Sequence, residues 1–205
     1  MKSRACIGCG AALLTRRADA RACSSTCRNR AARARRARPV PPCMATANRW
    51  VRWALRPRGG RLTKVPLTVH GRHASSTRAA TWTRRPAAAA SRVGAGLGYV
   101  LGDGVGCYDL DGALDRGRLK DWARDALAAI PEPALFVEVS QSGTGLHVFV
   151  VAPPGPGTVT RHAGGAVERY TTGRYIAMTG VPFDVPDGLL RWATPLDAAL
   201  VAARR

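Results

Sequence analysis

The stretch L-G-Y-V-L-G-D-G-V-G-C-Y-D-L-D-G at residues 97–112 decides the fold prediction, because a glycine-bearing turn separates two short apolar segments. The Gly-Asp-Gly turn at 102–104 between such segments is typical of a β-hairpin. In the second segment, Asp109 and Asp111 are separated by one leucine, so on a strand both carboxylates point to the same face. We therefore expect a hairpin whose second strand presents two acids at a spacing suited to a shared metal ion.

The sequence downstream of this stretch predicts alternating strands and helices. Apolar residues recur every three or four positions from 119 to 130 and stop at Pro131, as in a helix with one buried face. The predicted strands are L-F-V-E-V-S (135–140), G-L-H-V-F-V-V-A (145–152), A-V-E-R-Y (166–170) and R-Y-I-A-M-T-G (174–180), and an amphipathic helix is expected over 189–203. This pattern predicts an α+β fold with helices packed on an antiparallel or mixed sheet.

The positive charge of the chain is large and unevenly distributed. The 205 residues have a formal net charge of +19. Residues 1–92 contain 22 Lys and Arg against one acid, Asp19, whereas residues 93–205 contain 10 Lys and Arg against 12 acids. GC-rich coding accounts for part of the arginine excess but not for its one-sided distribution. Because clustered Lys and Arg bind phosphate backbones through counterion release, nucleic acid is the expected partner.

Nothing in the sequence indicates a membrane segment. No run of 18 or more apolar residues occurs, and the N-terminus M-K-S-R-A-C-I-G-C-G lacks the apolar centre of a signal peptide. We expect a cytoplasmic protein with no membrane partner, whose six cysteines are reduced. Cys43 and Cys107 are expected to be spare or buried thiols.

Four of the cysteines have the spacing of zinc ligands. Cys6-x2-Cys9 and Cys23-x3-Cys27 are separated by 13 residues, which lets four thiolates reach one tetrahedral Zn²⁺. A site with four sulfur ligands has no open position, so the zinc would be structural. Four unrelated thiols, or a solvated basic tail, are the alternatives. The expected domains are a four-cysteine, zinc-binding basic module at 1–38, a Pro-rich linker at 39–47 and a catalytic domain at 48–205.

Two further features have the chemistry of a phosphate and metal site. The turn Q-S-G-T-G at 141–145 can offer backbone N–H groups to phosphate, and His147 follows it at the start of a strand. A packing role for His147 is the alternative, because it alternates with apolar neighbours. Glu168 is an acid inside a predicted strand, where a partner or a metal must offset its desolvation.

The order of these motifs resembles the primase-polymerase (prim-pol) branch of the archaeo-eukaryotic primase superfamily, which is often found on phages and plasmids. The resemblance covers about residues 48–180, including Lys64-x-Pro66 and Thr81-Trp82. It implies an RRM-like catalytic sheet joined to a smaller α/β module. It also implies a DNA primase or DNA-directed polymerase of replication, which is a nucleotidyltransferase. Gln141 departs from the family by replacing a frequent proline.

The resemblance also assigns the catalytic metals. Asp109, Asp111 and Glu168 would bind Mg²⁺ or Mn²⁺. Two such ions can activate a primer 3′-hydroxyl and stabilise the leaving pyrophosphate. His147 would act with these acids by contacting the phosphates of the incoming nucleotide. The full set of nucleotide-binding residues that the resemblance implies is Lys64, Ser142, Gly143, Gly145, His147 and Arg174.

The partners implied are a single-stranded DNA template and nucleoside triphosphates. Whether a separate helicase supplies the unwinding is left open by the sequence. The main alternative is a non-catalytic, zinc-containing DNA-binding protein of replication or regulation. A rolling-circle nicking enzyme needs two histidines flanking one apolar residue, whereas Val148 and Phe149 follow His147. A protein that only coats nucleic acid would have no use for three acids in this order.

Overall fold

The computed structural model describes residues 24–25, 28 and 40–203 of the chain. The chain divides into one unit of residues 40–179 with 183–205 and another of 1–39 with 180–182. Every helix and strand named below belongs to the first unit. The predicted zinc ligands Cys6, Cys9, Cys23 and Cys27 lie outside the described residues, so the zinc module stays a prediction.

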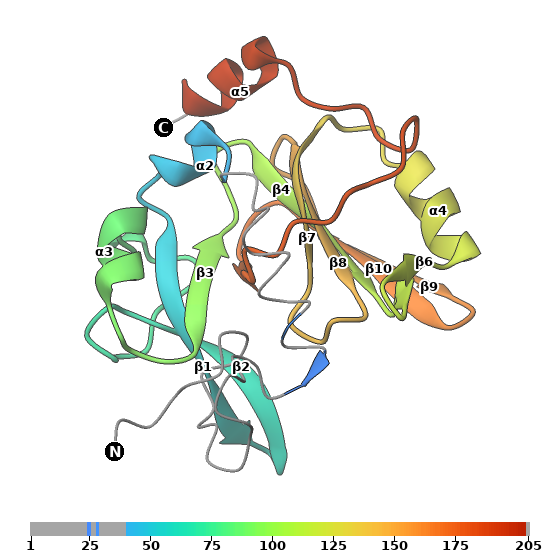
Figure 1. The fold of residues 1–205 in the computed structure, drawn as a ribbon. Coiled ribbons are helices and arrows are strands. Elements are labelled where there is room, and N and C mark those ends of the chain that lie inside the picture. The colour runs from blue at the N-terminus through green and yellow to red at the C-terminus, as the bar shows by residue number, and fades with distance from the viewer. Residues whose placement is uncertain (1–23, 26–27, 29–39, 204–205) are drawn as a thin grey trace. The chain divides into compact units, whose positions relative to one another are not determined.

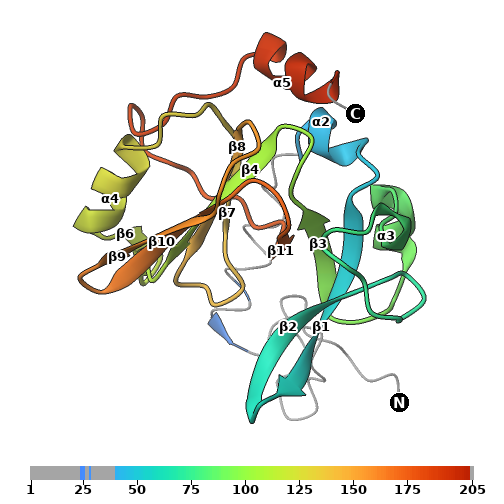
Figure 2. The ribbon, with the colours of Figure 1, turned by 180° about the vertical axis from the view of Figure 1, so that it is seen from behind.

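Two antiparallel sheets form the framework of the first unit (Figures 1 and 2). The four-stranded sheet has the order β11 (Tyr175–Ala177), β3 (Gly96–Val100), β1 (Trp50–Arg58) and β2 (Arg61–Leu67). The five-stranded sheet has the order β7 (Ala134–Val139), β8 (Leu146–Val151), β4 (Val105–Asp111), β10 (Gly165–Tyr170) and β9 (Thr158–His162). A short ribbon joins β5 (Leu114–Asp115) to β6 (Arg118–Leu119). With a few short helices, these sheets confirm the predicted α+β class.

The helices are α2 (Pro42–Ala45), the 3-10 turn η1 (Ala79–Thr81), α3 (Arg85–Ala90), α4 (Asp121–Ala128) and α5 (Pro195–Ala202). The predicted helix before Pro131 is confirmed as α4. The closing helix is shorter than predicted, because Thr194 and Asp197 form a capping box that begins α5 at Pro195. In the described part of the chain the longest helices, α4 and α5, have eight residues, and none could cross a bilayer.

The predicted hairpin at the Gly-Asp-Gly turn is wrong, because β3 and β4 belong to different sheets. A single bridge, Gly102 to Val105, joins the two segments. All three turn residues have positive φ, from 50° at Asp103 to 140° at Gly102, and Arg49 holds the Asp103 carboxylate at 2.6 Å. This sharp turn passes the chain from one sheet to the other, where β4 finds neighbours on both sides.

The connection from β4 through α4 to β7 is a split β-α-β unit. β8 lies between β4 and β7 and is antiparallel to both, so these two strands are parallel. Trp122 of α4 stacks on His162 of β9, with ring centroids 5.1 Å apart, and lies over Gly165. Alternation places Gly165 and Glu168 on opposite faces of β10, so α4 covers the face away from the acids. The predicted likeness to RRM sheets stays a prediction.

The aromatic part of the core lies on the face of the five-stranded sheet that α4 leaves free, and Leu110, Val148 and Leu127 are buried on the α4 side. Phe136, Cys107 and Phe149 share the free face, and the Tyr99 ring meets Phe149 edge-on at 6.4 Å. Tyr99 in turn meets Trp50 of β1 at 5.2 Å, so the two sheets are joined by aromatic packing. Burying a side chain such as Phe149 contributes roughly 1.5–3 kcal/mol.

Part of the predicted linker at 39–47 is packed in this unit. Cys43, Met44 and Ala47 are buried, and Trp50 donates its indole N–H to the carbonyl of Met44 at 2.9 Å. Cys107 is also buried. The two cysteines among the described residues, Cys43 and Cys107, are therefore buried core groups, as the sequence predicts.

Candidate active site

The register of the five-stranded sheet aligns four polar side chains in one row. Glu138 on β7 is paired with His147 on β8, which is paired with Asp109 on β4, which is paired with Glu168 on β10. Directly paired residues of neighbouring strands project to the same face. The acidic row, as we call these four residues, lies two positions along the strands from the aromatic core row on that face. Sequence reasoning placed three of the four in the site and missed Glu138.

Glu138 holds His147 in place. Glu138 is 0% exposed and His147 is 3% exposed, with Oε1 of the acid 2.9 Å from Nδ1 of the ring. The backbone N–H of Thr179 donates to both Glu138 oxygens at 3.1 Å. A buried carboxylate needs such partners to offset its desolvation. With Nδ1 engaged, Nε2 of His147 is the ring nitrogen that faces Asp109, 3.8 Å from Oδ1.

The sequence contains a feature that could have identified Glu138 as a site residue. It is an acid within the apolar strand L-F-V-E-V, and the reasoning that singled out Glu168 applies to it equally. The structure shows the packing role that the sequence left open for His147, and its contact with nucleotide phosphates stays a prediction. His147 is a buried side chain in contact with the core, its ring 6.4 Å from Phe149, and it faces the site.

One carboxylate oxygen of Asp109, the buried Oδ1 atom, lacks a hydrogen-bond partner among the described residues. Burial is the largest influence and raises the pKa of this carboxyl, and His147 lowers it. The neighbouring charges of Asp111 and Glu168 raise it further, while Lys64 lowers it. A buried carboxylate oxygen without a donor, next to two more acids, has the chemistry of a ligand for a hard divalent cation.

The other two predicted metal ligands flank Asp109 on the same face. Asp111 is exposed at the end of β4, and Glu168 is 24% exposed. Glu168 Oε2 accepts a hydrogen bond from the Tyr170 hydroxyl at 2.9 Å and lies 3.4 Å from Nη2 of Arg174. Among residues 24–25, 28 and 40–203, no group of three His, Cys, Asp or Glu side chains converges as a ready metal site. The three acids therefore share a face, while Glu168 is turned to its own partners.

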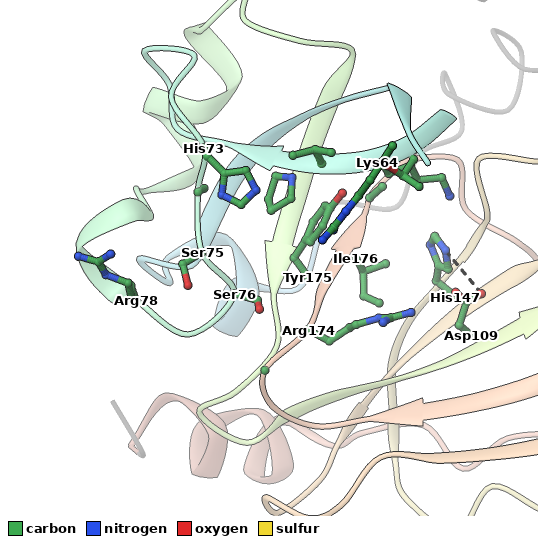
Figure 3. Close-up of a pocket in the computed structure, with 17 residues that line it drawn as sticks. Lys64, His73, Ser75, Ser76, Arg78, Asp109, His147, Arg174, Tyr175 and Ile176 are labelled. Atoms are coloured by element: carbon green, nitrogen blue, oxygen red, sulfur yellow. Dashed lines mark ion pairs between the residues drawn. The ribbon is translucent and has the colours of Figure 1, made fainter. Parts of the chain in front are cut away.

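A cavity of about 670 Å³ lies beside the acidic row (Figure 3). Asp109 and His147 line it from the five-stranded sheet, and Lys64 of β2 lines it from the other sheet. Arg174 and Tyr175 lie along the same cavity. The predicted residues Lys64, His147 and Arg174 are thus brought together. The cavity is large enough for a substrate of nucleotide size, and it has one acid, Asp109, at one wall and several basic side chains around it.

The Q-S-G-T-G turn is not part of the cavity lining. Its hydroxyls form a chain, with Ser142 Oγ 3.0 Å from both Ser140 Oγ and Thr144 Oγ1. A Cβ on Gly145 would lie 2.8 Å from the Leu110 carbonyl oxygen, so this glycine is required where the turn approaches β4. Gly143 has φ +79° and open space around it. The phosphate-binding role of Ser142, Gly143 and Gly145 stays a prediction.

The segment 73–78 lines the cavity opposite Asp109 and was not predicted as part of the site. His73, Ser75, Ser76 and Arg78 contribute to it. Thr81 and Trp82, which carried part of the family resemblance, hold this segment in position. The Trp82 indole N–H donates to the Ser75 carbonyl at 2.6 Å, and Thr81 Oγ1 accepts from the Ser75 N–H at 3.0 Å. No sequence pattern marks the segment 73–78 as part of a site, because it has no periodic apolar residues.

An acidic row on a rigid sheet, facing a cation-lined cavity, defines a site suited to phosphorylated substrates and divalent cations. A curated protein described as a DNA primase-polymerase, from Nitratiruptor phage NrS-1, is 37% identical to this chain over 160 residues. The match covers 72% of this chain and 22% of that protein, so the chain spans about a fifth of its relative's length. No family model matches the chain. The similarity supports a relationship with phage primase-polymerases.

Proposed function

We propose that the chain contains the catalytic domain of a DNA primase-polymerase, which adds nucleotides to a growing strand under the direction of a DNA template. The observation that carries the proposal is the in-register row of Asp109, Glu168 and His147 beside a cavity lined by Lys64 and Arg174. The 37% identity to a phage DNA primase-polymerase supports it independently.

Asp109, Asp111 and Glu168 would hold the Mg²⁺ or Mn²⁺ ions. When bound, such ions favour attack by a 3′-hydroxyl and offset the charge that develops on the leaving pyrophosphate. The unsatisfied Oδ1 of Asp109 fits this role, because a cation would supply its missing partner. To join the site, Glu168 would exchange its contact with Arg174 for the cation, which would free Arg174 to meet phosphate.

The remaining polar residues would bind the nucleotide. His147 presents Nε2 toward the cavity, and Glu138 keeps the ring from turning away. Lys64 and Arg174 would offset the charge of a triphosphate. The walls of the cavity would also exclude water from the reacting groups, which strengthens each of these charge interactions.

Template-directed incorporation tests this function. The full chain is incubated with a homopolymer single-stranded template, each labelled nucleotide separately, and Mg²⁺ or Mn²⁺, with and without a primer. We expect incorporation of the complementary nucleotide only. Incorporation without template dependence would indicate a terminal transferase. No incorporation under any of these conditions, with tight binding to the template retained, would favour the non-catalytic DNA-binding protein.

We also propose that residues 1–38 form a zinc module that adds affinity for the template, motivated by the spacing of the four cysteines and the arginine-rich run after them. Freshly purified chain should contain one zinc, and the double variant Cys6→Ser/Cys9→Ser should lose it. Deletion of 1–38 should weaken template binding and flatten its salt dependence. Zinc content well below half an equivalent in unchelated wild-type protein would exclude the site.

A further inference from the structure

The β1–β2 hairpin extends beyond the sheet to which it belongs. β1 and β2 are paired from Arg52 with Leu67 to Arg58 with Arg61, whereas β3 pairs only with residues 50–53 of β1. Figures 1 and 2 show the two strands continuing past the end of β3. Residues 55–62 are all exposed. The hairpin therefore presents a two-stranded ribbon, and no third strand of the described residues pairs with its outer half.

One face of this ribbon is strongly positive. Arg56, Arg58 and Arg61 share it, because Arg58 is paired with Arg61 and Arg56 lies two residues before Arg58. Residues 50–67 contain no acid. None of the three arginines forms an ion pair with another described residue. We call this surface the arginine face.

The pairing of Arg58 with Arg61 is unfavourable for the fold alone. Like charges directly opposite each other on an antiparallel pair are destabilising, and the turn at Gly59 and Gly60 brings these two together. A polyanion seated on the arginine face would replace this repulsion with attraction. Binding of a polyanion would therefore relieve a repulsion that is present in the unbound hairpin.

The arginine face borders the cavity. Arg58 and Thr63 of this face line the cavity that contains Asp109, and Lys64, on the opposite face of the ribbon, lines it too. Along the strand, Arg56 and Arg58 are about 6.7 Å apart, a spacing that suits successive phosphates of one extended backbone. A strand lying on the ribbon would therefore be led toward the acidic row.

We infer that the β1–β2 hairpin binds the sugar–phosphate backbone of a single nucleic-acid strand and directs it into the cavity. The identity of that strand as the template rests on the proposed function. Phosphate contacts of this kind fix position and register and carry no base specificity. Binding should thus depend on salt and be nearly independent of sequence.

The test uses the full chain with Arg56→Ser/Arg58→Ser/Arg61→Ser. A matched control, Arg118→Ser/Arg124→Ser/Arg161→Ser, removes the same charge from exposed arginines of β6, α4 and β9. Affinity for a fluorescent single-stranded oligonucleotide and for a duplex of the same sequence is measured at several salt concentrations. We expect the hairpin variant to lose at least about tenfold in single-strand affinity, and its log–log salt slope to fall by about 2. The control should keep most of both.

Two further readouts separate the possible failures. The melting temperature of the hairpin variant should equal or exceed that of the wild type, because a like-charge pair is removed, so lost binding would not reflect unfolding. Unchanged single-strand affinity and salt slope, or a loss confined to the duplex, would overturn the inference even if the wild type incorporates nucleotides. If the wild type incorporates none but the hairpin variant still loses affinity, the proposed function fails while the hairpin remains a nucleic-acid surface.

Discussion

The two sheets of the described unit contribute opposite charges to one cavity, and they hold them differently. The five-stranded sheet carries Glu138 on its edge strand β7 and His147 and Asp109 on the inner strands β8 and β4, in register. Glu138 and His147 are buried, and Asp109 is 25% exposed. The four-stranded sheet contributes Lys64 and Arg58, which are exposed on long side chains near its edge. Groups that must meet reacting atoms benefit from rigid support, whereas groups that follow a polymer benefit from freedom to adjust.

The largest effect is expected from removing the acids. Asp109→Ala, Asp111→Ala and Glu168→Ala should each lower the turnover of nucleotide incorporation by about 10²-fold or more, because charge stabilisation in the transition state is lost. Template affinity should stay near normal or rise as repulsion is relieved. Asp125→Ala, an exposed acid on α4, is the matched control and should leave turnover unchanged. If Asp109→Ala and Asp111→Ala incorporate nucleotides at the wild-type rate, the two carboxylates have no catalytic role.

The second effect concerns the support of the acidic row. Glu138→Ala removes the partner of His147 and of the Thr179 N–H, and breaking a fully buried pair costs about 3 kcal/mol. Urea unfolding should show a lower midpoint, and Glu138→Gln should lose less because it keeps an acceptor. Stability of Glu138→Ala equal to the wild type would mean that the pair contributes little and that His147 is held by packing.

A smaller effect is expected for the nucleotide contact. His147→Ala should raise the KM for the nucleotide by roughly tenfold, the loss of one charge-assisted hydrogen bond. Part of the lost rate should return at high nucleotide concentration, which would not happen for the acid variants. Steady-state kinetics over a wide nucleotide range separates the two. A pure loss of kcat for His147→Ala would place the histidine with the acids instead.

The sequence allowed the five-stranded sheet to be predicted better than the four-stranded one. Strands β7, β8 and β10 are short, mostly apolar segments, so their strand character could be predicted, and His147 stands out as the single polar residue of β8 and Glu168 as the single acid of β10. β1 and β2 could not be predicted, because half of each strand is exposed and its arginines follow no burial pattern. The sheet change at Asp103 was also hidden, because a Gly-Asp-Gly turn does not specify which strands will pair.

The smallest effect concerns Asp109 in the absence of metal. Burial raises the pKa of this carboxyl, so its ionised form disfavours the folded state. This cost appears as the pH rises from the ordinary pKa of 3.8 through the raised value, and it is fully present above that value. Asp109→Asn should therefore have a higher melting temperature than the wild type at pH 7 in EDTA. The difference should disappear below pH 3.8, and a gain that persists there would have another cause.

If the acidic row and Asp111 bind divalent cations, Mn²⁺ should stabilise the folded chain, and thermal unfolding at increasing Mn²⁺ measures this stabilisation. The wild type and Asp109→Asn are melted at increasing Mn²⁺ without nucleotide or template. A cation that binds only the folded chain at 100 times its Kd stabilises it by about 2.7 kcal/mol. We expect the melting temperature of the wild type to rise with Mn²⁺ and that of Asp109→Asn to rise little or not at all. Equal rises for both proteins, or no rise for either, would contradict this expectation.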